Sequence, residues 1–233
     1  MVNKTFCTEK IIDFIETAEQ YLSGCLEIND VKTSFLNNIS DNEDNLNVFL
    51  IKLDVIKTKL HGDLLFFLES DPAIDNEDEV IFAYPGYKAI VYYRVAHALN
   101  NMDFKFISRV ISEHAHFLTG IDIHPEAKIG CPFFIDHGTG IVIGQTAIVG
   151  DYVKIYQGVT LVALSLGKGH LLKGTKRHPT VGNHVTLYSG ASILGDITIG
   201  NNVVIGSNVF LTDSIGDNYK VVLSKPELIL IKK

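Results

Sequence analysis

Three short groups of ionisable residues in the second half of the chain could do chemistry. They are Asp122 with His124, Asp136 with His137, and Arg177 with His178. A histidine whose ring is oriented by a carboxylate can take a proton from a hydroxyl group. An arginine can clamp a carboxylate or a phosphate. These groups therefore point to acid–base chemistry, in which a histidine would take the proton of a hydroxyl group.

The residues between these groups indicate which elements must position them. An isoleucine, valine, alanine or leucine occupies every sixth position over about ninety residues, in two phases. They are Ile123, Ile129, Ile135, Ile141, Ala147, Val153 and Val159, and then Val181, Leu187, Ile193, Ile199, Ile205 and Leu211. This period fits neither a helix nor a single strand. It is the hexapeptide repeat of a parallel β-helix, in which three hexads close one triangular coil.

The length of one coil predicts a contact between Asp122 and His137. Three hexads hold about 18 residues, so the position one coil below His137 falls near residue 119, three residues from Asp122. Neighbouring coils lie about 4.8 Å apart, so the Asp122 carboxylate could accept a hydrogen bond from the ring and raise its basicity. The alternative is a corner histidine that is satisfied by backbone groups.

The hexapeptide pattern lapses between Val159 and Val181, which predicts a loop extruded at residues 161–180. The loop contains four cations and two histidines but no acidic residue: Lys168, Lys173, Lys176, Arg177, His170 and His178. Such a loop could hold phosphates, for example those of coenzyme A. The alternative is a solvated loop that binds nothing.

Residues 1–120 carry apolar residues at helical spacing and predict an α-helical N-terminal domain. The predicted helices run from Glu9 to Leu22, from a Ser40–Glu43 capping box to Ser70, from Pro85 to Leu99, and from an Asp103 cap to Gly120. Residues 74–79 are acidic and predict a loop. We expect the β-helix to occupy residues 121–216 and a C-terminal tail to occupy residues 217–233.

Composition limits the class of protein. The 233 residues include 20 basic and 27 acidic side chains, a net charge of −7 that argues against nucleic acid as a partner. Cys7, Cys25 and Cys131 are scattered and form neither a disulfide framework nor a metal quartet. No stretch is apolar enough to enter a membrane, so we expect a soluble, cytoplasmic protein.

Several longer segments resemble the serine O-acetyltransferases, the hexapeptide-repeat enzymes of the first step of cysteine biosynthesis. They are ESDPAID (69–75), YPGYKAIVYYRVAHAL (84–99), DIHPEAKIG (122–130), IDHGTGIVIGQTAIVGD (135–151), YQGVTL (156–161) and KRHPTVGNHVTLYSGASILGDITIG (176–200). The resemblance implies a helical N-terminal domain followed by a left-handed parallel β-helix. It also implies a homotrimer or a dimer of trimers, with active sites between subunits. Acetyl-CoA would be the co-substrate, and no metal is expected.

The resemblance also assigns roles to particular residues. His137 would be the general base that takes the proton of the L-serine hydroxyl, and Asp122 would orient it. Four residues would bind the amino acid: Asp71, Asp136, Arg177 and His178. Seven would bind the coenzyme: Ser189, Gly190, Ala191, Gly206, Ser207, Ala163 and Lys168.

Two partners follow from the same resemblance. L-cysteine is nearly isosteric with L-serine and is expected as a feedback inhibitor. Family members often end in an isoleucine that inserts into the next enzyme, the sulfhydrylase or cysteine synthase. Here the last residues are Ile231-Lys232-Lys233, which argues against that complex.

Three other functions are compatible with a hexapeptide β-helix. One is acetyl transfer to another hydroxyl or amine acceptor, such as a sugar, an antibiotic or homoserine. The second is a zinc-dependent hydratase similar to the γ-class carbonic anhydrases, which needs three histidines around the metal. The third is a non-catalytic scaffold. The combination of Asp71, Asp122, Asp136, His137, Arg177 and His178 favours the serine enzyme.

Overall fold

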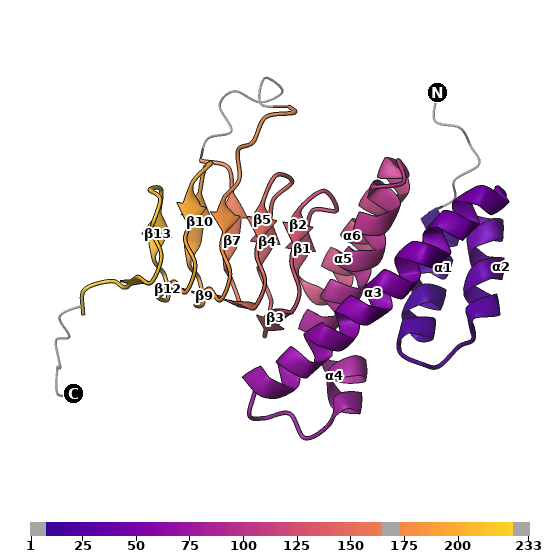
Figure 1. Cartoon of the computed structure of the whole chain (residues 1–233), viewed down its shortest axis with the longest axis horizontal. Coiled ribbons are helices and arrows are strands. Elements are labelled where there is room, and N and C mark those ends of the chain that lie inside the picture. The colour runs from indigo at the N-terminus through magenta and orange to yellow at the C-terminus, as the bar shows by residue number, and fades with distance from the viewer. Residues whose placement is uncertain (1–7, 165–172, 226–233) are drawn as a thin grey trace, which may run out of the picture.

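The computed structural model describes residues 8–164 and 173–225, in which six helices precede a parallel β-helix (Figure 1). The helices are α1 (Thr8–Leu22), α2 (Ile28–Asn38), α3 (Glu43–Ser70), α4 (Glu77–Ala83), α5 (Pro85–Asn100) and α6 (Lys105–Thr119). None of these helices combines the length and the apolar character that a membrane span requires.

Three parallel sheets form the faces of the β-helix. The first face contains β1 (Asp122–Ile123), β4 (Val142–Ile143), β7 (Thr160–Val162), β10 (Ser192–Leu194) and β13 (Phe210–Leu211). The second contains β2 (Lys128–Ile129), β5 (Ile148–Val149), β8 (Thr180–Val181) and β11 (Thr198–Ile199). The third contains β3 (Phe133–Asp136), β6 (Val153–Tyr156), β9 (Thr186–Leu187), β12 (Val204–Ile205) and β14 (Lys220–Val221).

The hexapeptide prediction is confirmed by burial. All thirteen residues of the six-residue pattern lie inside the coil, and none is more than 9% exposed. In the second half of the β-helix these residues stack directly on one another in successive coils, as when Leu187 pairs with Ile205 and Ile193 pairs with Leu211. A continuous apolar column therefore stabilises the β-helix, with each coil depending on its neighbours.

The coil that contains His137 is longer than 18 residues. Asp122 pairs with Val142, twenty residues later, whereas Val142 pairs with Thr160, eighteen residues later. The extra length lies between β3 and β4, where His137 and Gly138 have φ angles of 57° and 82°. Left-handed φ angles recur at other corners of this β-helix, as at Tyr152, His184 and Asn202, so at His137 the conformation provides the sharp turn of a corner.

The extruded loop also changes one coil. Ile148 pairs with Thr180, thirty-two residues later, which confirms an insertion between β7 and β8. Residues 165–172 of this loop lie outside the described part of the chain. The predicted end of the β-helix at residue 216 is wrong. The strand Lys220–Val221 pairs with β12, so the third face continues into residues that were predicted to form the C-terminal tail.

The helical region differs from its prediction in two elements and two caps. The sequence reasoning missed α2 and placed a loop where α4 begins at Glu77. Asn42, rather than Ser40, caps α3, because its side chain accepts hydrogen bonds from the backbone of the first turn. Asp103 does not cap α6, since Phe104 takes the cap position and Asp103 has a φ angle of 67°.

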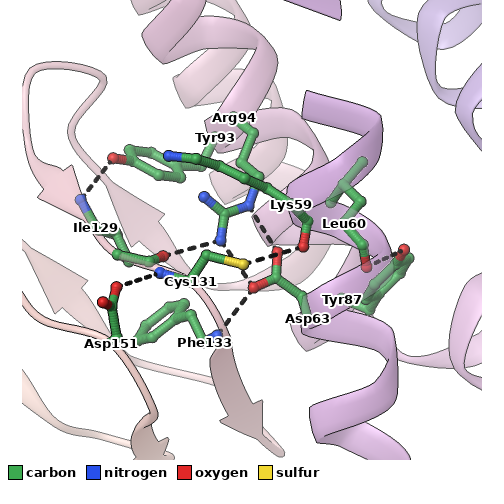
Figure 2. Close-up of polar contacts among 11 residues, drawn as sticks. Lys59, Leu60, Asp63, Tyr87, Tyr93, Arg94, Ile129, Cys131, Phe133 and Asp151 are labelled. Carbon is green, nitrogen blue, oxygen red and sulfur yellow. Dashed lines mark hydrogen bonds and ion pairs between the residues drawn. The ribbon is translucent and has the colours of Figure 1, made fainter. Parts of the chain in front are cut away.

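A buried ion pair joins the helices to the first coil (Figure 2). Arg94 of α5 donates through Nε and Nη2 to the two carboxylate oxygens of Asp63 on α3, at 2.7 and 2.8 Å. Arg94 also donates to the carbonyl of Gly130, and the backbone N–H of Phe133 donates to Asp63. The two side chains are 3% and 0% exposed, so the hydrogen bonds compensate for their lost hydration.

Removing one partner of this pair should destabilise the whole junction. We expect Arg94→Met to lower the free energy of unfolding by about 3–5 kcal/mol, because the Asp63 carboxylate would stay buried without its counter-ion. Urea unfolding at matched protein concentration measures this change. Arg109→Met, which removes an exposed ion pair with Glu113, is the control and should cost less than about 1 kcal/mol. Equal effects of the two substitutions would contradict a special role for the buried pair.

Candidate active site

The candidate site residues lie at two different corners of the triangular coil. We call the turns between the third and first faces the base corner, which contains His137 and residues 188–191 and 206–209. We call the turns between the first and second faces the arginine corner, which contains His124, residues 144–147 and Arg177 with His178. Both corners flank the first face.

The base corner combines the histidine with two carboxylates. Nε2 of His137 lies 3.6 Å from Oδ1 of Asp136, and the His137 side chain is 71% exposed. Partial burial raises the pKa of Asp136, with a further increase from the nearby charge of Asp71 and an opposing effect of His137. The helical region thus contributes a second acid to this corner through Asp71.

Two hydrogen bonds hold Asp71 in place at the end of α3. The backbone N–H of Ala73 donates to Oδ1 at 2.9 Å, and the hydroxyl of Tyr84 donates to Oδ2 at 2.9 Å. Burial and the neighbouring carboxylate raise the pKa of Tyr84 to about 12, so its hydroxyl stays protonated and remains a donor. Tyr84 was not singled out from the sequence, although it lies in a segment that carries the family resemblance.

Asp122 does not meet His137 within one chain. The ion pair that His137 forms inside the described chain is with Asp136. Asp122 lies opposite Val142 on the first face, and its charge acts on His124 of the arginine corner. The contact expected from an 18-residue coil is therefore not formed within the chain, because this coil has two more residues at the base corner.

The arginine corner is organised around the hydroxyl of Thr146. This oxygen accepts hydrogen bonds from the backbone N–H groups of Arg177 and His178, at 3.0 and 3.1 Å. Its own proton is thus directed at Nδ1 of His178, 2.8 Å away, to which the backbone N–H of Thr146 also donates. Nδ1 of His178 is therefore unprotonated, and the neutral ring carries its proton on Nε2.

The environment keeps His178 neutral. Burial lowers its pKa to about 4, with further lowering by the charges of Arg177 and Lys176. The ring covers Gly144 so closely that a Cβ on this glycine would lie 2.2 Å from Nε2. His178 can therefore donate a hydrogen bond from Nε2 but does not supply a positive charge at neutral pH.

Arg177 supplies the positive charge of this corner. Its guanidinium Nη2 bonds to the side-chain oxygen of Gln145, and the amide of Gln145 donates to Glu126 at 2.8 Å. These two hydrogen bonds link Arg177 to residues of the two preceding coils and so fix the direction of its guanidinium. Gln145 and Thr146 were not predicted, because each lies some thirty residues before its partner and only the folded coil brings them together.

Most predicted coenzyme residues lie on the base corner. Ser189 and Ser207 are one coil apart, with their hydroxyl oxygens at 3.2 Å. One coil before Ser189, Gly158 lies against the backbone of Gly190, which a Cβ on Gly158 would meet at 3.5 Å. No side chain therefore projects between these two glycines. Ala163 instead follows β7 at the arginine corner, and Lys168 lies outside the described residues.

The three site histidines do not gather into a metal site. Across residues 8–164 and 173–225, no group of three histidine, cysteine, aspartate or glutamate side chains is arranged to hold a metal ion. His124, His137 and His178 instead have the separate hydrogen-bonding and ionic partners described above. The zinc hydratase alternative therefore has no ligand set in this part of the chain.

Comparison with known proteins assigns the chain to a class. Residues 178–213 match the family model for bacterial transferase hexapeptide (six repeats). The chain is 33% identical to serine acetyltransferase isoform 3 of Entamoeba histolytica, solved in complex with cysteine. This match has a TM-score of 0.82 and covers 94% of this chain and 84% of that one. The repeat and the fold together define a hexapeptide-repeat transferase.

Curated relatives make the assignment specific. The chain is 48% identical over 162 residues to the serine acetyltransferase of Helicobacter pylori, covering 70% of this chain and 91% of the relative. It is 46% identical over 170 residues to the plasmid serine acetyltransferase of Synechococcus elongatus, covering 72% of this chain. It spans only 53% of that longer relative. The chain belongs to the serine acetyltransferase family.

The neutral state of His178 predicts a pH dependence of stability. The unfolded chain binds a proton at the ordinary pKa of 6.5, whereas the folded chain resists protonation down to about pH 4. The free energy of unfolding should therefore fall as the pH is lowered from 6.5 towards 4. Thermal unfolding at several pH values measures this slope, which should be shallower in His178→Gln. The same slope in both proteins would contradict a neutral, buried His178.

Proposed function

We propose that the chain transfers the acetyl group of acetyl-CoA to the hydroxyl of L-serine, in sites formed between two subunits. The products are O-acetylserine and coenzyme A. The observation that carries this proposal is the division of complementary charges between two corners: two carboxylates and the base at one, and a fixed guanidinium at the other. An amino-acid zwitterion needs both, and one chain holds them apart.

A cyclic trimer would bring the two corners together. In such an assembly each subunit presents one surface to the next and a different surface to the previous one. The first face, between the two corners, offers suitable apolar surface: Phe210 is 67% exposed, and Val142 and Leu194 are partly exposed. We therefore infer that the base corner of one subunit meets the arginine corner of its neighbour across this face.

This arrangement also gives Asp122 its expected role. Asp122 lies on the first face, so it would approach His137 of the next subunit rather than its own. The exposed His137 ring would then be covered and oriented at the interface. A carboxylate at Nδ1 would leave Nε2 free to accept the hydroxyl proton.

The mechanism follows from these positions. Arg177 would bind the carboxylate of L-serine with help from the Nε2 proton of His178, while Asp71 and Asp136 would bind its ammonium group. His137 removes the hydroxyl proton as the oxygen attacks the thioester carbonyl. The tetrahedral intermediate collapses and expels the coenzyme thiolate, which takes the proton back from His137. Holding both substrates in place supplies much of the rate enhancement.

The base corner suits the coenzyme. Ser189 to Ala191 and Gly206 with Ser207 lie on the same edge as His137, two and three coils further along. At about 4.8 Å per coil, this edge would guide a long, narrow thiol arm to the base over roughly 10–15 Å. Ala163 and Lys168 would contribute from the loop at the arginine corner.

The same contacts would bind L-cysteine as a feedback inhibitor. Cysteine has the same ammonium and carboxylate groups as serine, and its thiol would lie where the hydroxyl reacts. The Entamoeba isoform 3 enzyme was solved with cysteine, and a Neisseria gonorrhoeae serine acetyltransferase with serine. We further propose a cytoplasmic enzyme without a metal cofactor.

Release of the coenzyme A thiol tests the activity. We expect release from acetyl-CoA that depends on L-serine, and a kcat about 10²–10⁴-fold lower in His137→Ala because the general base is lost. The exposed histidine variant His116→Ala is the control and should keep the parent rate. Release with L-homoserine or a hexose, but not with L-serine, would contradict the proposed substrate.

Mixed assemblies test whether the site spans two subunits. His137→Ala and Arg177→Ala are each expected to be inactive, but random co-assembly should restore about one quarter of the sites. Each restored site takes its intact base corner from the Arg177→Ala chain and its intact arginine corner from the His137→Ala chain. Co-assembly of His137→Ala with Asp71→Ala, two changes at one corner, is the control and should restore nothing. No restoration in the first mixture would place the site within one chain.

Tyr84 should act on serine binding through Asp71. We expect Tyr84→Phe to raise the KM for L-serine about tenfold, because Asp71 loses the hydrogen bond that directs it at the ammonium group. The KM for acetyl-CoA should stay the same. Tyr87→Phe removes a buried hydroxyl three residues further along, in the first turn of α5, and should leave both values unchanged. A parallel rise in both KM values would indicate a structural effect instead.

A further inference from the structure

A groove with no part in the proposed reaction lies where the helices meet the second face of the β-helix. Its volume is about 490 Å³, which falls in the range of small-molecule sites. Helices α3 and α5 form one wall, and β2 and β5 form the other. Figure 1 shows these elements side by side at the junction.

The inside of the groove is apolar. Ile56, Ala98, Ile129 and Val149 line it and are buried. Val55 and Ile148 also line it, one from each wall, and both are exposed large apolar residues. An apolar group placed between them would remove this surface from water.

The charged residues around this apolar surface are mainly cationic. Lys52, Lys59 and Lys128 line the groove with His97, and its lining contains no aspartate or glutamate. This is unusual for a chain with 27 acidic and 20 basic residues. Within the described part of the chain, none of the three lysines forms an ion pair.

The ammonium groups are therefore available to a ligand. The Lys59 side chain reaches across Arg94 towards Tyr93 (Figure 2). Arg94 also lines the groove, but its charge is already matched by Asp63. Burial lowers the pKa of His97, and the charges of Lys59, Arg94 and Lys128 lower it further. A positive field thus extends over the apolar surface.

We propose that this junction groove binds a small organic anion, a carboxylate or a phosphate monoester carried on an apolar chain or ring. The anionic group would lie between Lys59 and Lys128, and the apolar part would pack between Val55 and Ile148. Lys128 and Ile148 also line a smaller cavity that contains Gln145 and Arg177. The ligand would therefore lie beside the arginine corner without occupying it.

A series of eight-carbon probes tests the chemistry of this groove. Calorimetric titration of the full chain in its native assembly would compare octanoate, octyl phosphate, 1-octanol and octylamine. We expect one or both anions to bind about tenfold or more tightly than 1-octanol, and octylamine to bind least. The better of the two anions identifies the preferred group. Equal binding of octanol and the anions, or no binding of either anion at millimolar concentration, would overturn the proposal.

Lysine variants test the location. The double variant Lys59→Met with Lys128→Met should weaken binding of the better anion by about tenfold or more, because two charge-assisted contacts are lost. Lys57→Met is the matched control: it lies on the same helix but outside the groove, with its ammonium over the Tyr21 ring. It should change the affinity less than about twofold. Unchanged binding by the double variant would overturn the proposed site.

Discussion

The buried pair of Asp63 and Arg94 is the constraint on which the rest of the structure depends. It bonds α3 to α5 and both helices to the backbone at Gly130 and Phe133, so it sets the helical region against the first coil. The position of Asp71 follows, since this residue directly succeeds α3. A single ion pair therefore fixes how the carboxylate from the helices approaches Asp136 at the end of β3.

The hexapeptide repeat imposes the second constraint, and the site is built where the repeat is broken. Regular coils repeat their buried positions every six residues, as in Val185 with Leu187 and Val203 with Ile205, and leave short, uniform corners. The two additional residues before β4 turn His137 outwards in a left-handed conformation, and the insertion after β7 carries Arg177 and His178. Backbone irregularity of this kind persists because the stacked core on either side compensates for its cost.

Much of this arrangement could be predicted from the sequence, because a period of six is a strong local signal. The buried column, the helix from Pro85 and the insertion before Val181 were all predicted correctly, while the left hand of the coil rests on the family resemblance. The helix at Glu77 was missed because its first turn is acidic and carries little apolar pattern. The Thr146–His178 bond was also missed, because its partners are separated by an irregular insertion. A register error of two residues was enough to misplace Asp122 relative to His137.

The separation of charges between two corners has a physical consequence for an isolated chain. In the single chain, burial raises the pKa of Asp136, the charge of Asp71 raises it further, and His137 opposes both effects. Bringing the corners of two subunits together would add the missing positive charge and exclude water from the base. The charges needed to bind a zwitterion would then also stabilise the assembly, so that binding and association reinforce each other.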